Sequence, residues 1–311
     1  MPHEFRANCA TGPFSQAATH PPAHVGPSGP VNLSPRTKPC CGERSAVSYH
    51  TSFIDTKRWL IQLAGAFFQT TGEIIILLLA IIREIPAGLM RPGRIMRQFQ
   101  IWGWQSLPIA VFIGLFVGLI VSLQMGRALL QFGTPESIGS VAGISITREM
   151  GPVISAFVIA GRVGAAMAAE LGTMSVTEEV DALRSMGISP VRYLLVPRFV
   201  AGVLMLPLLT FYSIFVGFWG GALIADAMLG VSSSLYFSLL YETLVMKDLH
   251  EALIKSVVFG ALISLVCCHC GMAARGGPDA VGRATTKGVV LSLMGILMAD
   301  FFIGRFLHSI I

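Results

Sequence analysis

Five long apolar blocks, each interrupted by few charges, dominate this sequence. Each block is close to the roughly 20 apolar residues that a helix needs to cross the hydrocarbon core of a bilayer. Backbone polar groups inside a membrane must be satisfied within the protein, so each block is predicted to be a helix. The blocks cover residues 105–126, 152–169, 199–225, 252–272 and 288–307. The predicted fold class is therefore an all-α integral membrane protein with five transmembrane helices.

The composition agrees with this class and excludes a soluble protein. Hydrophobic residues make up 53% of the chain and charged residues only 13%, against about 25% in soluble domains. The net charge is +5, but the Lys and Arg residues are scattered between the apolar blocks and form no basic stripe with interleaved aromatic residues. We therefore expect no nucleic-acid partner.

Three regions are predicted: a tail at 1–50, interfacial helices at 51–100 and a transmembrane domain at 101–311. The tail is rich in Pro, Gly, Ser and Thr without periodicity, which is typical of disorder. An organellar transit peptide is an alternative for the tail, although Arg is sparse there. The interfacial region holds an aliphatic run at 74–82 that is too short for a simple span. We expect its helices to lie in the cytoplasmic membrane interface, with a short span at 72–86 as the alternative.

Basic residues indicate the orientation. Lys and Arg are concentrated before the first block and in the loops after the second and fourth blocks. By the positive-inside rule, the N-terminus is predicted to lie in the cytoplasm and the C-terminus on the opposite side.

Small residues recur at helical spacing inside the blocks and let helices approach closely. They fit either tight packing within one subunit or a dimer seam, and the sequence does not separate the two. The residues are Gly114 and Gly118 in the first block, Gly161, Gly164 and Ala165 in the second, and Gly217, Gly220 and Gly221 in the third.

The loop between the second and third blocks contains a predicted helix of its own. Ser175 with Glu178 three residues later has the pattern of a capping box at a helix start. Gly187 suits the position just after the helix end, and Pro190 is expected to prevent a restart.

The two faces of this loop helix differ in character. Val176, Val180, Leu183 and Met186 form an apolar stripe, whereas the other face is mainly acidic. A helix that lies on lipid favours Lys and Arg on its polar face, because anionic headgroups repel carboxylates. The acidic face therefore favours docking to another protein.

Several motifs, in order along the chain, resemble those of MlaE-type (YrbE-type) ABC-transporter permeases. They include Arg148-Glu149-Met150-Gly151-Pro152, Ala160-Gly161-Arg162-Val163-Gly164, Val176-Thr177-Glu178-Glu179, Pro197-Arg198-Phe199 and Arg283-Ala284-Thr285-Thr286. The resemblance extends from about residue 57 to residue 310 and leaves out only the tail.

This resemblance implies a homodimeric permease that works with two copies of a separate cytoplasmic ATPase and with an MCE-domain lipid-binding protein. It implies transport of phospholipid or a related lipid between the inner membrane and the outer envelope. The expected location is a bacterial inner membrane, with the plastid inner envelope as the alternative. In this family the loop helix is the coupling helix on the ATPase. The matching residues are Glu170, Thr177, Glu178, Glu179, Asp181 and Leu183.

The sequence predicts no catalytic residues and no metal site. Residues 277–284 are close to a phosphate-binding loop, but Arg283 and Ala284 stand where Lys and Ser or Thr are needed. ATP and Mg²⁺ are therefore expected on the partner ATPase, with no cofactor bound by this chain. The Cys-Cys-His-Cys run at 267–270 is too short to surround one tetrahedral metal. An intramembrane lipid-modifying enzyme and a membrane scaffold protein remain alternative functions.

Charges at matched depth in the blocks are predicted to form a polar cluster in the substrate path. Burying a charge in a membrane is expensive, and pairing lowers that cost. The residues are Arg148, Glu149, Lys255 and Asp300. Arg162 lies in mid-span and must find a partner or a wet cavity.

An apolar pocket for the lipid chains is also predicted, with ordinary helix packing or lipid contact as the alternative for each residue. The candidates are Ile113, Phe116, Val117, Ile120, Leu297 and Phe301.

Overall fold

The computed structural model describes residues 52–88 and 92–310, and the predicted tail at 1–50 lies outside them. All regular structure in the described residues is helical. Five helical stretches among them are long and apolar enough to span a membrane. These stretches are Gly93–Gln131, Pro135–Val176, Val191–Leu229, Met246–Met272 and Pro278–Phe306. Each overlaps one of the five apolar blocks, so the predicted fold class is confirmed.

The region predicted to be interfacial forms two helices, α1 and α2. α1 is one continuous helix, Ser52–Gly88, and is not among the five spanning stretches. α2 (Pro92–Phe99) continues through a π-helical segment, η1 (Gln100–Trp104), into α3 (Leu107–Gln131). α2 is therefore the start of the first spanning stretch, whereas α1 is a separate helix.

The second spanning stretch alternates between α-helical and π-helical segments. π-helical turns are rare and occur mostly as single-turn bulges, often at functional sites. η3 contains Arg148 and Glu149, and η4 contains Arg162. After a short 3₁₀ turn, η2 (Pro135–Ser137), the segments are α4 (Ile138–Ser145), η3 (Ile146–Met150), α5 (Gly151–Ile159), η4 (Ala160–Gly164) and α6 (Ala165–Val176).

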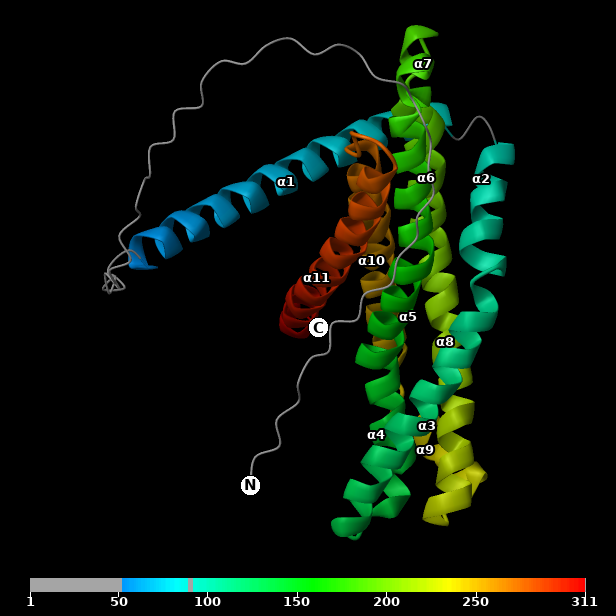
Figure 1. Ribbon diagram of the computed structural model, residues 1–311. Coiled ribbons are helices and arrows are strands. Elements are labelled where there is room, and N and C mark those ends of the chain that lie inside the picture. The colour runs from blue at the N-terminus through cyan, green and yellow to red at the C-terminus, as the bar shows by residue number, and fades with distance from the viewer. Residues whose placement is uncertain (1–51, 89–91, 311) are drawn as a thin grey trace, which may run out of the picture. The chain divides into compact units, whose positions relative to one another are not determined.

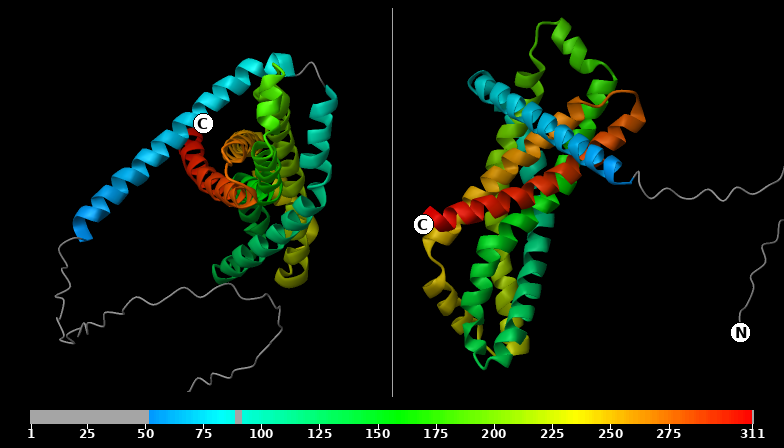
Figure 2. Two further views of the ribbon diagram at one scale, coloured as in Figure 1. Left: turned by 45° about the horizontal axis from the view of Figure 1, so that its top comes forward. Right: turned by 90° about the vertical axis from the view of Figure 1, so that its left-hand side faces the viewer.

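The remaining helices complete the bundle (Figure 1). α10 packs against α6, α8 and α11, while α3 packs along α8 (Figure 2). Within the most apolar stretch of each helix, 61% of α10 is buried by the chain, but only 11% of α11. α10 is thus the central helix, and most of α11 faces outward. The bounds are α7 (Glu179–Ser185), η5 (Val191–Leu195), α8 (Val196–Leu229), α9 (Ser233–Thr243), α10 (Met246–Met272) and α11 (Pro278–Ile310).

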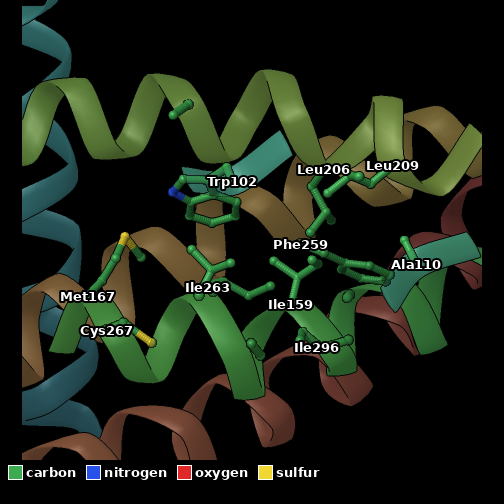
Figure 3. Close-up of a cluster of buried hydrophobic side chains, with 14 of the residues drawn as sticks. Trp102, Ala110, Ile159, Met167, Leu206, Leu209, Phe259, Ile263, Cys267 and Ile296 are labelled. Atoms are coloured by element: carbon green, nitrogen blue, oxygen red, sulfur yellow. The ribbon is translucent and has the colours of Figure 1, made fainter. Parts of the chain in front are cut away.

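The largest apolar core lies where η1, α5, α8 and α10 meet (Figure 3). Trp102 from η1, Ile159 from α5, Leu206 from α8 and Phe259 from α10 are all buried there. Because these side chains come from four different segments, the core fixes the positions of the spanning helices.

Close packing within the chain accounts for most of the small residues noted in the sequence. A methyl group at Gly118 would collide with the backbone of Gly217, and one at Gly114 with that of Ser213. α3 and α8 can therefore approach closely only without these side chains. Gly161 differs, because a methyl group there would meet open space.

Candidate functional site

Lys255, on α10, is the centre of the charged site. Its Nζ lies 2.8 Å from Glu149 Oε1 and 3.2 Å from Asp300 Oδ1. It also lies 3.4 Å from Glu251 Oε1 and donates to the backbone carbonyl of Arg148 at 3.0 Å. The Lys255 side chain is 0% exposed. We call Glu149, Lys255, Glu251 and Asp300 the Lys255 cluster.

Four residues were predicted for this site. The side chains of Glu149, Lys255 and Asp300 meet there, and Arg148 joins them through its backbone carbonyl. The guanidinium of Arg148 points to Asp248, with Nη2 at 2.6 Å and Nε at 2.8 Å from Oδ1. Asp248 also accepts the backbone N–H of Val245 at 3.3 Å, which closes the first turn of α10. Arg148 and Asp248 thus form a second ion pair next to the cluster.

Two carboxylates of this region, Glu251 and Asp248, were missed from the sequence. Glu251 lies one helical turn before Lys255, and this spacing alone places the two on one face of α10. Asp248 lies 100 residues from Arg148 in the chain, so no local pattern pairs them.

A mainly apolar groove of about 350 Å³ lies beside Glu149, between α3 and the α4–α5 region. Two of the six predicted pocket residues, Val117 and Ile120, line it. Ile113 and Phe116 lie on the same helix but do not line this groove, and Leu297 and Phe301 are exposed on α11. The full lining is Val117, Ile120, Val121, Gln124, Met125, Ser145, Glu149, Met150 and Ile154. We call it the Glu149 groove.

Arg162, in mid-span, has a neutral partner. Its Nη1 lies 2.5 Å from Oγ of Ser106, which is fully buried just before α3. This contact joins the second spanning stretch to the first and provides the partner that the sequence required.

The loop helix begins later than predicted, and the capping box is wrong. Ser175 still belongs to α6, and its Oγ donates to the carbonyls of Met272 and Ala274 at 3.2 and 3.0 Å. Glu178 adopts a left-handed backbone, φ 60°, which separates α6 from α7. The Ser175 hydroxyl caps no helix because it is used in a tertiary contact with the end of α10.

The end of the loop helix agrees with the sequence at one position and not at another. Gly187 has φ +73° and donates to the carbonyl of Arg184, while Ile188 donates to that of Leu183, both at 3.0 Å. This is the expected Schellman ending. Pro190, however, opens the next helix. The expectation for Pro190 was wrong because proline is tolerated in a first helical turn, where its missing N–H has no partner.

The apolar stripe predicted for the loop helix is right for Val180 and Leu183 only, because Val176 belongs to α6 and Met186, past the end of α7, is 64% exposed. Val180 is buried, and Leu183 packs against the same apolar cluster, which includes Ile81 of α1. Glu178 and Glu179 are exposed. The side chain of Asp181 is also exposed and pairs with Arg184 at 3.0 Å. The acidic face is therefore available on the surface.

Other residues near α7 tie the loop to the bundle. The buried Arg198 holds Glu170 at 2.8 Å and joins α6 to α8. Thr177 donates to the carbonyl of Thr173 at 3.0 Å. Glu170 and Thr177, two of the residues carried over for the coupling helix, are thus bonded within the chain.

The segment just after the loop is joined to both N-terminal helices. Arg192 pairs with Glu84 of α1 at 2.6 Å. Arg94 of α2 lies over the ring of Tyr193, 3.6 Å from its centre. The start of the third spanning stretch is therefore connected to both α1 and α2.

The cysteines of the 267–270 run are buried free thiols. Within residues 52–88 and 92–310, no group of three or more His, Cys, Asp or Glu residues is arranged to hold a metal ion.

Known proteins match the chain over the spanning region. A family model described as "Permease MlaE" matches residues 95–306. A probable ABC transporter permease protein of Synechocystis is 38% identical over 79% of this chain and 90% of its own length. The chloroplastic protein TRIGALACTOSYLDIACYLGLYCEROL 1 of Arabidopsis thaliana is 39% identical over 73% of this chain and 65% of its own. The intermembrane phospholipid transport system permease protein MlaE of Haemophilus influenzae is 32% identical over 76% of this chain and 91% of its own length. The ordered motifs, the five spanning helices and these matches agree, and the chain is a member of the MlaE permease family.

Proposed function

We propose that this chain is the permease subunit of an ABC transporter that moves phospholipid or a related lipid between membranes. The observation that carries the proposal is the Lys255 cluster beside the Glu149 groove. Ionisable residues inside a membrane are costly and mark substrate paths. An apolar groove with one charged residue at its side suits a molecule with apolar chains and a polar headgroup. The name of the Haemophilus relative, a phospholipid transport permease, supports the same substrate class.

The energy for transport comes from a separate ATPase that docks on α7. ATP and Mg²⁺ bind to that partner, since the 277–284 segment lacks the Lys and Ser or Thr of a phosphate-binding loop. Support for the docking site comes from the exposed acidic face of α7 and from its attachment to the bundle through Val180.

The complete transporter contains two copies of this chain and an MCE-domain protein on the outer side of a bacterial inner membrane. A plastid inner envelope is the alternative location. The largely uncovered face of α11 supports a homodimer, because the exposed Leu297 and Phe301 would then be covered by the second copy.

Reconstitution tests the function directly. The chain and its ATPase, placed together in liposomes, should transfer phospholipid to an MCE-domain acceptor only when ATP is hydrolysed. The isolated chain should show no ATPase activity. Robust hydrolysis by the pure chain, or no ATP-dependent lipid transfer by an assembled and ATP-hydrolysing complex, would overturn the proposal.

A further inference from the structure

We propose that the Glu149 groove selects phospholipids whose headgroup carries a cationic amine, and that Glu149 is the residue that determines this selectivity. The inference rests on the proposed function and deepens it by naming the class of lipid that is moved.

The lining of the groove supplies the first step. Glu149 is the one charged residue among the described residues that line it, and its side chain is 50% exposed. Gln124 and Ser145 add neutral polar groups, while the other lining residues are apolar. A headgroup that enters the groove therefore contacts a carboxylate, and none of the lining residues is cationic.

The two nearby cations are already engaged, which is the second step. Lys255 Nζ has three N–H donors and four oxygen atoms within 3.4 Å, from Glu149, Glu251, Asp300 and the carbonyl of Arg148. Its side chain is also fully buried. Arg148 does not line the groove, and its guanidinium is held by Asp248. Lys255 is therefore not free to hold a lipid phosphate, and Arg148, although 44% exposed, lies outside the lining of the groove.

The balance of charge is the third step. Three carboxylates surround the ammonium of Lys255, and the neighbouring Arg148–Asp248 pair is neutral in sum. Glu251 and Asp300 are each 18% exposed, so the unbalanced negative charge reaches the groove chiefly through Glu149. A cationic amine compensates this charge, whereas an anionic headgroup without an amine is repelled.

The experiment compares headgroups on identical acyl chains. The complex of this chain with its ATPase is reconstituted in vesicles that contain phosphatidylethanolamine and phosphatidylglycerol in equal amounts, and ATP-dependent transfer of each is measured. We expect phosphatidylethanolamine to be transferred about three- to fivefold faster, the effect of one partly exposed ion pair. Equal transfer, or faster transfer of phosphatidylglycerol, overturns the inference and leaves the proposed function intact. No ATP-dependent transfer of any phospholipid counts against the proposed function instead.

Two variants assign the selectivity to a residue. Glu149→Gln should bring the ratio of the two transfer rates close to one. Glu251→Gln is the matched control, because it removes a carboxylate from the same lysine but not from the groove, and it should change the ratio much less than Glu149→Gln does. The inference fails if both variants change the ratio equally.

A third variant keeps the test decisive if Glu149→Gln does not fold. Gln124→Glu adds a second carboxylate to the groove without touching the Lys255 cluster, and it should raise the preference for phosphatidylethanolamine. An unchanged or lower preference in a folded Gln124→Glu complex contradicts the inference.

Discussion

The Lys255 cluster and the α7 region hold their charges in opposite ways. Lys255 is completely enclosed by four oxygen atoms, so its charge depends on its partners within the chain. Around α7 the carboxylates of Glu178, Glu179 and Asp181 are exposed. A charge enclosed by its own chain supports the structure around it, whereas an exposed set of like charges is available to a partner. The first region should therefore respond to mutation through stability, and the second through assembly.

The largest effect is expected from Lys255→Met. The change leaves three carboxylates without their cation, at a cost of about 3 kcal/mol, the lower end for a broken buried pair, because Glu149 is half exposed. Thermal unfolding of the purified permease measures this loss, and lipid transfer should fall with it. Adding Glu149→Gln should recover part of the stability, since both charges are then absent. Strictly additive effects in this double-mutant cycle would show that the two residues do not interact.

Reversal of the acidic face of α7 should have the next largest effect, on assembly alone. Glu178→Lys together with Asp181→Lys should weaken ATPase binding by at least about tenfold, as expected when complementary charges become repulsive. Pull-down of the ATPase and its hydrolysis rate are the readouts, with unchanged thermal unfolding of the permease. Glu136→Lys reverses an exposed charge on η2, near the other end of the bundle, and serves as the control. Normal assembly of the double variant would refute the role of this face.

The smallest effect is expected at the link between α1 and the start of the third spanning stretch. Arg192→Gln removes a partly exposed pair with Glu84, for which about 0.5 kcal/mol is typical. Thermal unfolding should fall slightly, and the exchanged pair Glu84→Arg with Arg192→Glu should restore it. A loss of stability as large as that caused by Lys255→Met would show that enclosed and exposed charges do not differ in the way proposed.

The spanning helices could be predicted from sequence because length and apolarity are local properties. The site was only partly predictable. Matched depth was enough to group Glu149, Lys255 and Asp300, but Asp248 meets Arg148 through tertiary packing alone. The predicted start of the loop helix was wrong because it, too, depends on tertiary contacts.

In the case of Ser175, the spacing to Glu178 was that of a capping box. The hydroxyl has better partners in carbonyls that lie 97 and 99 residues away. Short-range patterns thus fail where a side chain that could cap a nearby helix instead forms hydrogen bonds with residues distant in the sequence.

The π-helical segments of the second spanning stretch change how its sequence should be compared and probed. A single-turn bulge accommodates one extra residue, and each residue of an α-helix turns by about 100°. A helical wheel drawn with regular α-helical spacing therefore assigns residues to the wrong face, by about 100°, after η3 and again after η4. A cysteine-accessibility scan along 138–176 should show three separate phases rather than one. One-residue gaps are therefore expected in alignments at 146–150 and 160–164, because deletion of the extra residue returns the bulge to a regular turn and leaves the helix beyond it in the same orientation.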